Sequence, residues 1–237
     1  MRILAFDTAT RATTVALSGV GDVIFTARDD PKHGDRPGHA TRLLPLTAAV
    51  LRRAGIGWEG VDRIAVGIGP GTFTGLRIGI ASARALARAR GIPLVGVSTL
   101  QSLALAGPDA GSVPAGLDAV VAVIDARRGE VFAASWRLDE AQEFDNALLL
   151  PRAVAPELLT ELIAPLGPTA LAIGDGAIAF REVLERSGAF IPDDDSQLHR
   201  VTATNHCRLA VSLQASAADD VRPDYLRAPD AEMAHRS

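Results

Sequence analysis

The sequence predicts an α/β protein of two similar lobes, each with a mixed β-sheet flanked by helices. The 237-residue chain is 48% hydrophobic but only 4% aromatic, so its core must consist mainly of Ala, Val, Leu and Ile. Such a core favours parallel sheet covered by helices over an aromatic-rich sandwich. Both halves also open alike. An apolar strand ends in an aspartate, Asp7 or Asp125, and a β-turn-β pair and helices follow.

The first lobe is expected to cover residues 1–107. Its central unit, residues 62–98, consists of a buried strand, a Gly-rich loop, a long helix and a second strand. The two strands of such a unit are expected to be parallel, with a right-handed crossover between them. The other elements predicted for this lobe are strands at 3–7, 11–19 and 22–30, a polar loop at 29–38, and helices at 39–54 and 99–107.

A Pro/Gly-rich linker at 108–116 is the expected domain boundary, and the smaller second lobe is expected to cover residues 117–204. The helix near 205–217 is expected to join the first lobe, and residues 219–237 to form an extended tail. The elements predicted for the second lobe are strands at 118–126, 131–136, 148–150 and 169–174, and helices at 156–164 and from the GDGA turn to Arg186.

The bulk composition excludes several classes of protein. A net charge of −4 and a pI near 5.7 argue against a protein that binds nucleic acid by bulk electrostatics. Cys207 is the only cysteine, which excludes an intrachain disulfide and a cysteine-based zinc site. The apolar start is too short for a signal peptide, and no apolar run approaches the ~20 residues that span a bilayer. The expected compartment is the cytoplasm, without membrane attachment.

The Gly-rich loop from Gly69 to Gly75, GPGTFTG, lies between a strand and a helix. Backbone N–H groups at a helix start, approached closely through glycines, can hold an anion. The Lys-Ser/Thr of a P-loop is missing, however, and a tight turn with Thr72 as N-cap explains the pattern equally well. Aspartate and threonine after the first strand could add a metal-bound phosphate site, or could simply form a turn. The candidate phosphate-loop residues are Asp7, Thr8, Thr10, Gly69, Gly71 and Thr72.

The helix after this loop has small residues, Gly75, Gly79 and Ala83, at every fourth position. Glycine inside a helix costs about 1 kcal/mol relative to alanine, so two of them need a reason. Close approach of a partner helix is the favoured reason, and tight packing on the protein's own sheet is the alternative. A basic stripe of Arg77, Arg84 and Arg88 lies on another side of the helix.

No metal site or catalytic constellation is apparent in the sequence. The five histidines lack the spacing of paired helical metal ligands. No Ser-His-Asp set can be assigned, and GVSTL is not a G-x-S-x-G elbow. Asp125 and Asp175 follow apolar strands, where ligands bind in open α/β sheets. No cofactor is expected.

Seven motifs in order span nearly the whole chain and resemble the bacterial TsaB (YeaZ) family. They are ILAFDTAT…TTVAL, HATRLLP, DRIAVGIGPGTFTGLRIGIASARALA, IPLVGVSTLQSLA, IDARRGEVF, IGDGA and PDYLR. The resemblance implies a two-lobed ASKHA (actin/Hsp70-like) fold. It also implies a role in making the threonylcarbamoyl modification of the adenosine beside the anticodon in tRNAs that read ANN codons.

In that family TsaB is a non-catalytic accessory subunit. It pairs with the catalytic paralogue TsaD and the ATPase TsaE, and it meets tRNA only through the complex. TsaD-like proteins carry a metal-binding His-x-x-x-His, but here Leu43 stands four residues after His39. A homodimer through the same helices is a further expectation. The expected partner interface consists of His39, Leu43, Leu44, Gly75, Arg77, Gly79 and Ala83. The alternatives are an ASKHA-type small-molecule kinase, which would need a second Gly-rich loop for adenosine, and a glycoprotease-like metalloenzyme, which lacks ligands here.

Overall fold

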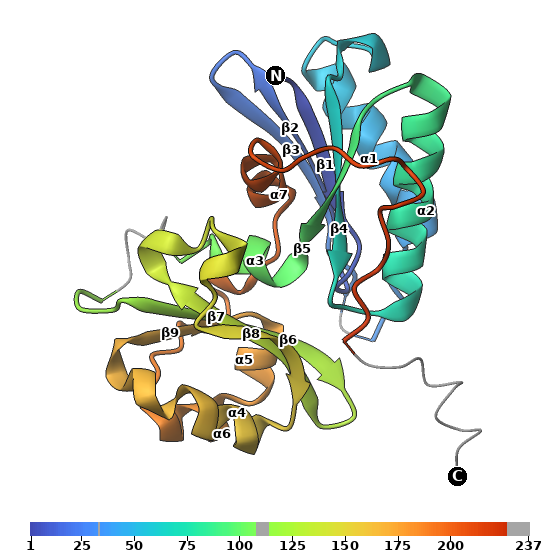
Figure 1. Ribbon diagram of the computed structural model, residues 1–237. Coiled ribbons are helices and arrows are strands. Elements are labelled where there is room, and N and C mark those ends of the chain that lie inside the picture. Colours follow the sequence, from blue (N-terminus) through green and yellow to red (C-terminus); the bar gives the residue numbers. More distant parts are fainter. Residues whose placement is uncertain (33, 108–113, 227–237) are drawn as a thin grey trace. The chain divides into compact units, whose positions relative to one another are not determined.

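The computed structural model describes residues 1–32, 34–107 and 114–226, which form two compact units (Figure 1). The first unit consists of residues 1–102 and 201–224, and the second contains residues 103–200. Each unit is built on one mixed sheet with helices packed against it. The predicted fold class, α/β with two similar lobes, is confirmed.

The sheet of the first unit has the strand order β3-β2-β1-β4-β5. Strand β1 runs antiparallel to β2 and parallel to β4, β2 runs antiparallel to β3, and β4 runs parallel to β5. The strands on either side of the Gly-rich loop are therefore parallel, as predicted. The five strands are β1 (Ile3–Asp7), β2 (Thr13–Val20), β3 (Val23–Asp29), β4 (Arg63–Gly69) and β5 (Leu94–Ser98).

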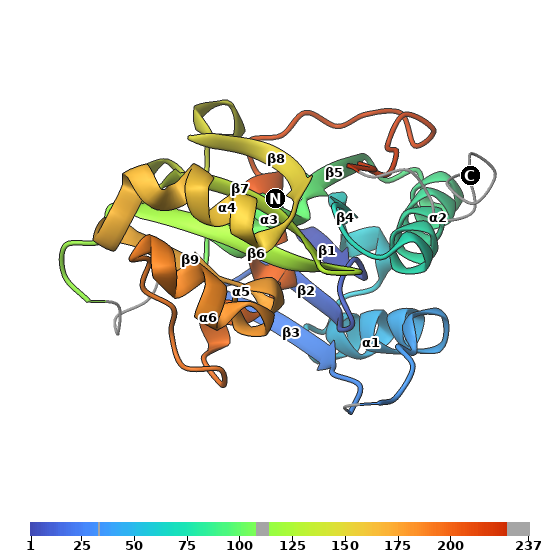
Figure 2. The same ribbon diagram turned by 90° about the horizontal axis from the view of Figure 1, so that it is seen from below.

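Helices cover both faces of this sheet (Figures 1 and 2). Helices α1 (His39–Arg53) and α2 (Phe73–Arg90) contact each other and pack on β2, β3 and β4. Helix α7 (Ala203–Ala210) packs on β1 and β2 from the other side. The core between the sheet and the helix pair is aliphatic apart from Phe6, and includes Leu43, Val50, Ile80 and Ala83.

The second unit repeats the order of four of the five strands of the first, without a counterpart of β5. Its sheet runs β8-β7-β6-β9, with β6 antiparallel to β7 and parallel to β9. Its strands are β6 (Ala119–Arg127), β7 (Glu130–Arg137), β8 (Leu149–Val154) and β9 (Ala170–Ile173). Its α-helices are α4 (Pro156–Ile163), α5 (Asp175–Ala179) and α6 (Arg181–Leu184), and α3 (Thr99–Ala104) spans the division between the units.

Short 3-10 helices complete the described chain: η1 (Trp58–Gly60), η2 (Leu138–Glu140), η3 (Phe144–Asn146), η4 (Ala164–Thr169), η5 (Glu185–Ser187) and η6 (Gln197–His199). Strand β8 extends four residues beyond the predicted 148–150. The predicted helix after the GDGA turn is interrupted at Phe180, whose backbone is not helical, which separates α5 from α6. Most of the predicted linker, residues 108–113, lies outside the described residues.

The bounds of the helix expected at 205–217 are wrong, because the observed helix α7 begins at Ala203 and ends at Ala210. The Arg63 guanidinium donates hydrogen bonds to the carbonyl oxygens of Ala210 and Leu213, and this fixes the helix end. Residues 211–224 then form what we call the C-terminal strap. It crosses β5, where Ser216 N donates to Leu94 O at 2.9 Å, and reaches the end of β4 (Figure 1). The described part of the expected tail, 219–226, begins within this strap.

Candidate functional site

Asp7 ends β1 and is completely buried. Its Oδ1 accepts a hydrogen bond from Ala9 N at 2.7 Å, and its Oδ2 accepts from Thr99 Oγ1 at 2.8 Å. The Oδ2 also lies 3.0 Å from His206 Nε2. On β4, a Cβ at Gly67 would lie 1.8 Å from this oxygen, so only glycine fits beside the carboxylate.

His206 continues the network away from Asp7. Its Nδ1 lies 2.7 Å from Ser102 Oγ and 3.1 Å from the carbonyl oxygen of Thr202. Burial raises the pKa of Asp7, but the hydrogen bond and charge of His206 outweigh it, with help from Ala9 N–H and Thr99, and the pKa lies below the ordinary value. Asp7 is therefore held as a carboxylate inside the core.

The contacts Ser102–His206–Asp7 give a Ser-His-Asp arrangement that we did not expect from the sequence. The three residues are far apart along the chain, and no sequence motif marks Ser102 or His206. All three side chains are buried, with exposed fractions of 0%. A nucleophile must reach its substrate, so this arrangement is structural.

The candidate phosphate-loop residues come together, but the protein's own groups already bind the Asp7 carboxylate, the Thr8 hydroxyl and the Thr72 N–H. Thr8 Oγ1 donates to Gly75 O at 2.7 Å, and Thr72 N donates to Ala9 O at 2.7 Å. A Cβ at Gly71 would lie 2.4 Å from that same Ala9 oxygen. Both Asp7 oxygens are also taken, so the geometry does not support a metal-bound phosphate at Asp7. It favours the alternative, a tight turn packed against the residues after β1.

The backbone of this turn is special at its first residue. Gly69 has φ +110°, and the peptide bond between Gly69 and Pro70 is cis. Thr72 stands at the N-cap of α2, but its side chain makes no capping hydrogen bond. Thr10 lies at the edge of the turn, half-buried, with its backbone hydrogen-bonded to His39.

Two expected interface residues, His39 and Leu43, face the core instead. His39 is 4% exposed, and its Nδ1 lies 2.9 Å from Thr13 Oγ1. Burial lowers the pKa of His39, against the opposing charges of Asp7 and Asp29. Leu43 is 1% exposed. Their i, i+4 spacing directs both toward the sheet, so neither side chain is available to a partner.

The small-residue stripe of Gly75, Gly79 and Ala83 also faces inward, which corrects the expectation of a partner helix there. A Cβ at Gly75 would lie 2.0 Å from Thr8 O, and one at Gly79 would lie 2.4 Å from Thr8 Oγ1. Ala83 is 0% exposed. The glycines bring α2 close to its own sheet.

Two of the three arginines of the basic stripe on α2 bind the protein's own C-terminal strap. The Arg84 guanidinium donates to Val221 O at 2.6 Å, and Arg88 forms an ion pair with Asp219. These contacts bind the C-terminal strap to α2. Arg77 instead stacks over the ring of Phe73, at 3.7 Å from the ring centroid.

A second stripe on α2, two residues out of phase with the first, is exposed. We define the outer face by exposed residues that recur at every fourth position on the two contacting helices. They are Ala40, Leu44, Ala48 and Arg52 on α1, and Phe73, Arg77, Ala81 and Ala85 on α2. Of the expected interface residues, Leu44 and Arg77 lie on it. The i, i+4 recurrence of Ala81 and Ala85 was visible in the sequence, but nothing there showed which stripe faces solvent.

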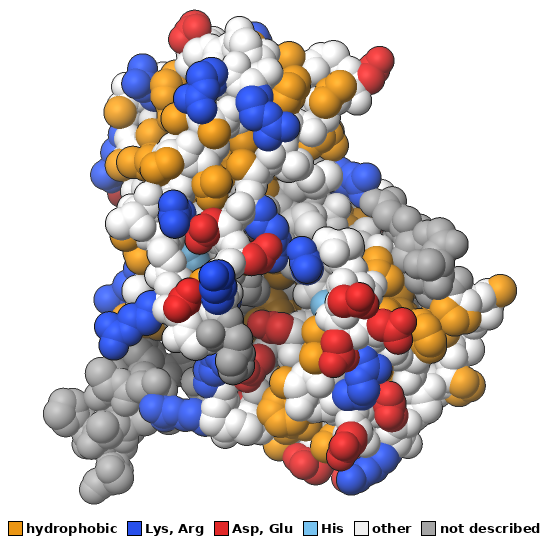
Figure 3. Space-filling view, turned by 180° about the vertical axis from the view of Figure 1, so that it is seen from behind, with side chains coloured by type: hydrophobic (Ala, Val, Ile, Leu, Met, Phe, Trp, Pro, Cys, Tyr) orange, Lys and Arg blue, Asp and Glu red, His pale blue; other side chains and the backbone are white. Residues whose placement is uncertain are grey.

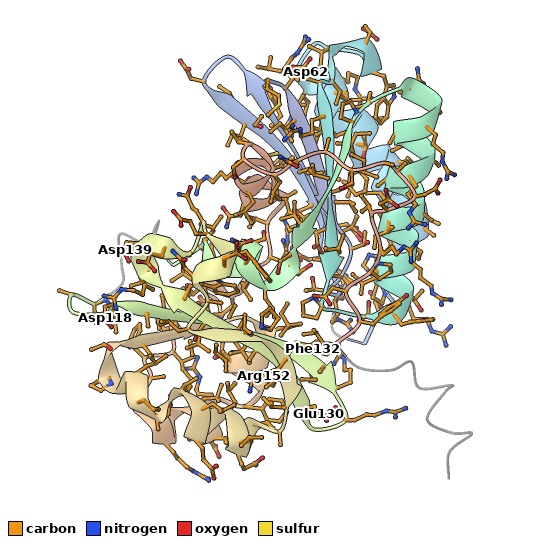
Figure 4. All side chains as sticks on the ribbon, viewed as in Figure 1. Asp62, Asp118, Glu130, Phe132, Asp139 and Arg152 are labelled. Atoms are coloured by element: carbon orange, nitrogen blue, oxygen red, sulfur yellow. The ribbon has the colours of Figure 1, made fainter. Side chains whose placement is uncertain are left out.

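In the second unit, Asp125 and Asp175 meet at the end of β6. Asp175 Oδ1 accepts from Asp125 N at 3.0 Å, and burial raises the pKa of Asp175. Asp125 in turn accepts from the backbone and side chain of Arg127 in the β6–β7 hairpin. Figure 4 shows Glu130 at this end of the hairpin strands. These carboxylates therefore brace the hairpin.

Cys207 is buried, and burial raises the pKa of its thiol to about 11. Within residues 1–32, 34–107 and 114–226, no group of three or more His, Cys, Asp or Glu side chains could hold a metal ion. In the same part of the chain, no helix is long and apolar enough to cross a membrane.

Two mixed sheets that share the order of four strands, each flanked by helices, place the protein in the class of two-lobed actin/Hsp70-like proteins. A family model described as TsaD, tRNA N6-adenosine threonylcarbamoyltransferase, matches residues 35–234. The Escherichia coli tRNA threonylcarbamoyladenosine biosynthesis protein TsaB is 32% identical over 234 residues, which cover 96% of this chain and 95% of that protein. The chain therefore belongs to the TsaB family, within the wider group that includes TsaD.

Two further comparisons agree with membership of the TsaB (YeaZ) family. The TsaB protein of Bacillus subtilis is 27% identical over 241 residues, with 98% of this chain and 96% of that protein covered. A crystal structure from Pseudomonas aeruginosa, described as similar to peptidase YEAZ, superposes with a TM-score of 0.77 at 29% identity. That match covers 95% of this chain and 99% of the other.

Proposed function

We propose that this protein is the non-catalytic accessory subunit of a tRNA N6-threonylcarbamoyladenosine transferase complex. In this role it binds a TsaD-like catalytic subunit through its outer face, a TsaE-like ATPase joins the pair, and tRNA is met only through the complex in the cytoplasm. Membership of a family named for threonylcarbamoyladenosine biosynthesis supports the pathway. The observation that carries the accessory role is the closed Asp7 cluster, beside which an exposed helical face remains.

The closed cluster argues against independent catalysis. A catalytic carboxylate must reach a substrate or a metal, whereas both oxygens of Asp7 accept hydrogen bonds from the protein in a fully buried position. His39 is likewise buried, and Leu43 stands where a second histidine would complete a metal pair. Among the residues that the structure describes, no contact favours the kinase or the metalloprotease alternative.

The outer face has the features of a helix-docking surface. Leu44 is 52% exposed and Phe73 36% exposed, and both are large apolar side chains on rigid helices. Alanines at 48, 81 and 85 lie along the same two stripes, and their small side chains allow another helix to approach closely. Ridges at i, i+4 spacing are those that interdigitate in the commonest class of helix packing. A partner that covers this face would remove the Leu44 and Phe73 side chains from water.

Leu44→Asp tests the proposal, with Leu158→Asp as the matched control. Leu158 lies on α4 of the second unit and is 47% exposed, so it offers the same change at a similarly exposed leucine. We expect Leu44→Asp to weaken binding to the TsaD-like protein of the same organism by at least about 1 kcal/mol, and Leu158→Asp to leave it unchanged.

This experiment measures both tRNA modification and the affinity for the TsaD-like protein. In reconstituted modification of tRNA, activity should require both proteins and should fall with Leu44→Asp. Threonylcarbamoyl transfer by the protein alone would contradict the accessory role. Wild-type affinity of Leu44→Asp for the TsaD-like protein would move the interface away from α1.

A further inference from the structure

The connection between β7 and β8 is longer than its counterpart in the first unit. In the strand order that the units share, β2 and β3 correspond to β7 and β8, and only Gly21 and Asp22 lie between them. Residues 138–148 lie between β7 and β8 and include η2 and η3. A hairpin loop needs only about two to five residues. The second unit therefore carries loop residues that its fold does not require, and such residues often bind other molecules.

This connection, on which Figure 4 labels Asp139, is acidic. It has no lysine or arginine, and its four carboxylates are those of Asp139, Glu140, Glu143 and Asp145. Asp139 forms an exposed ion pair with Arg137 at 3.9 Å. The surrounding unit is acidic too, since residues 103–200 carry 7 basic and 16 acidic side chains, a formal charge of −9. Figure 3 shows Asp and Glu side chains gathered over the second unit. Positive charge on a partner is therefore favoured here.

Large apolar side chains are exposed beside these carboxylates. Phe144 is 39% exposed, Leu148 49% and Leu150 57%. Leu149 packs on the core of the second unit, so its neighbours Leu148 and Leu150 project from the opposite face of the sheet. Exposed apolar residues that gather at one place, with charged residues around them, are typical of a surface that binds another protein.

Phe144 packs against a buried aromatic side chain. Its ring centroid lies 6.4 Å from that of Trp136, with an interplanar angle of 54°. Ser135 pairs with Leu149, so Trp136 faces the side of the sheet from which the exposed leucines project. Trp136 is 0% exposed, and its indole N–H has no hydrogen-bond partner among the described residues. Buried donors in native proteins are usually paired, and a bound partner is one source of an acceptor.

An added β-strand does not fit this place. Strand β8 is an edge strand of its sheet. Pro151 has no N–H to donate, and the carbonyl oxygen of Leu150 accepts a hydrogen bond from Arg152 Nε at 3.3 Å. Proline and charged side chains on an edge strand discourage pairing with another strand. A partner here therefore docks through its side chains.

We infer that this part of the second unit binds a basic segment of a protein partner, in which lysine or arginine surrounds an apolar side chain. We call it the β7–β8 surface, and it consists of Glu143, Phe144, Asp145, Leu148 and Leu150. The apolar side chain of the segment covers the phenylalanine and the two leucines, and its cations meet the carboxylates. The same carboxylates repel the phosphates of nucleic acid. The β7–β8 surface shares no residue with the outer face, so the inference does not rest on the proposed function.

A basic helical peptide tests the inference on the whole protein. The probe is a fluorescein-labelled amphipathic peptide with leucine at every fourth position and lysine at the others, and fluorescence anisotropy measures its binding. We expect the wild type to bind it, with an affinity that falls about tenfold between ~50 mM and ~500 mM NaCl. Glutamate in place of the lysines should abolish binding. Serine in place of the leucines should weaken it about tenfold.

Charge variants of the protein locate the binding. Glu143→Gln/Asp145→Asn should weaken binding of the peptide about fivefold, because it removes two carboxylates of the β7–β8 surface. The matched control is Glu157→Gln/Glu161→Gln, which makes the same charge change at two exposed positions on α4 of the same unit. This control should bind the peptide as the wild type does.

Leucine variants test the apolar contribution separately. Leu148→Ser should weaken binding about fivefold, whereas Leu158→Ser on α4 should leave it unchanged. The two leucines are matched in exposure, at 49% and 47%. Circular dichroism establishes that each variant is folded.

Several results would overturn the inference. They are failure of the wild type to bind the lysine–leucine peptide at ~50 mM NaCl, equal affinity for the glutamate peptide, and equal weakening by the α4 controls, which would show a general response to net charge or to lost apolar surface. Tighter binding of a labelled RNA oligonucleotide, lost in the β7–β8 variants, would assign the surface to nucleic acid instead. Self-association that sedimentation equilibrium detects in the wild type but not in Leu148→Ser would assign it to a second copy of this chain.

Discussion

Replacing Asp7 by asparagine tests the central claim about the buried cluster. Three donors converge on the Asp7 carboxylate: Ala9 N–H, Thr99 Oγ1–H and His206 Nε2–H. An asparagine amide offers one oxygen and one NH2 group, so at least one donor faces another donor. A buried donor without an acceptor costs about 1–3 kcal/mol.

We therefore expect Asp7→Asn to lower the free energy of unfolding of the first unit by about 1–3 kcal/mol, a large part of a typical domain's stability. Urea denaturation followed by tryptophan fluorescence measures it, since Trp58 lies in the first unit and Trp136 in the second. The control is Asp22→Asn at an exposed hairpin position, which should change stability by less than about 0.5 kcal/mol.

The direction of the Asp7 pKa shift predicts how the stability of the folded state depends on pH. The folded-state pKa of Asp7 is lowered, so its ionisation stabilises the folded state above the ordinary aspartate pKa, and this stabilisation is lost as pH falls through the lowered value. The stability difference between the wild type and Asp7→Asn should narrow below about pH 4. A difference under ~1 kcal/mol at neutral pH would refute the buried pairing. A variant of unchanged stability that lost ATP binding would restore the phosphate role of Asp7.

Three other predictions concern the packing of the first unit. Gly79→Leu should destabilise the first unit by at least about 2 kcal/mol, whereas Ala81→Leu, on the exposed side of the same helix, should fold normally and block binding of the partner. Thermal denaturation compares the two variants. Equal stability would show that the inward stripe is not tightly packed. Cys207 should react with a thiol reagent only after unfolding, because burial keeps its pKa near 11; rapid labelling of the native protein would contradict this. Arg84→Ala should raise amide hydrogen exchange in the C-terminal strap, and unchanged protection would show that the strap is held by other contacts.

The strand segments and one parallel pair could be predicted from the sequence because their signals are local, whereas the order of the strands in each sheet was not predicted. Alternating and continuous apolar runs marked the strands, and the unit on either side of the Gly-rich loop fixed a parallel pair. The partner of Asp7 could not be found in this way. His206 lies 199 residues from Asp7 and has no motif around it, so only the folded chain brings the two together. The requirement for glycine at Gly67 follows from the same contact and was equally hidden.

Helix α2 shows why a periodic pattern identifies a helix more readily than its orientation. It carries two stripes of small residues, one through Gly79 and Ala83 and one through Ala81 and Ala85, and both recur at every fourth position. The glycines drew attention to the first stripe, because glycine in a helix requires a close neighbour. That neighbour is Thr8 of the same lobe. Alanine is already the best helix former, so the second stripe carries no such cost and gives no such signal. A surface that binds a partner reversibly must fold without it, and the stripe that keeps the helix stable alone is the one suited to that use.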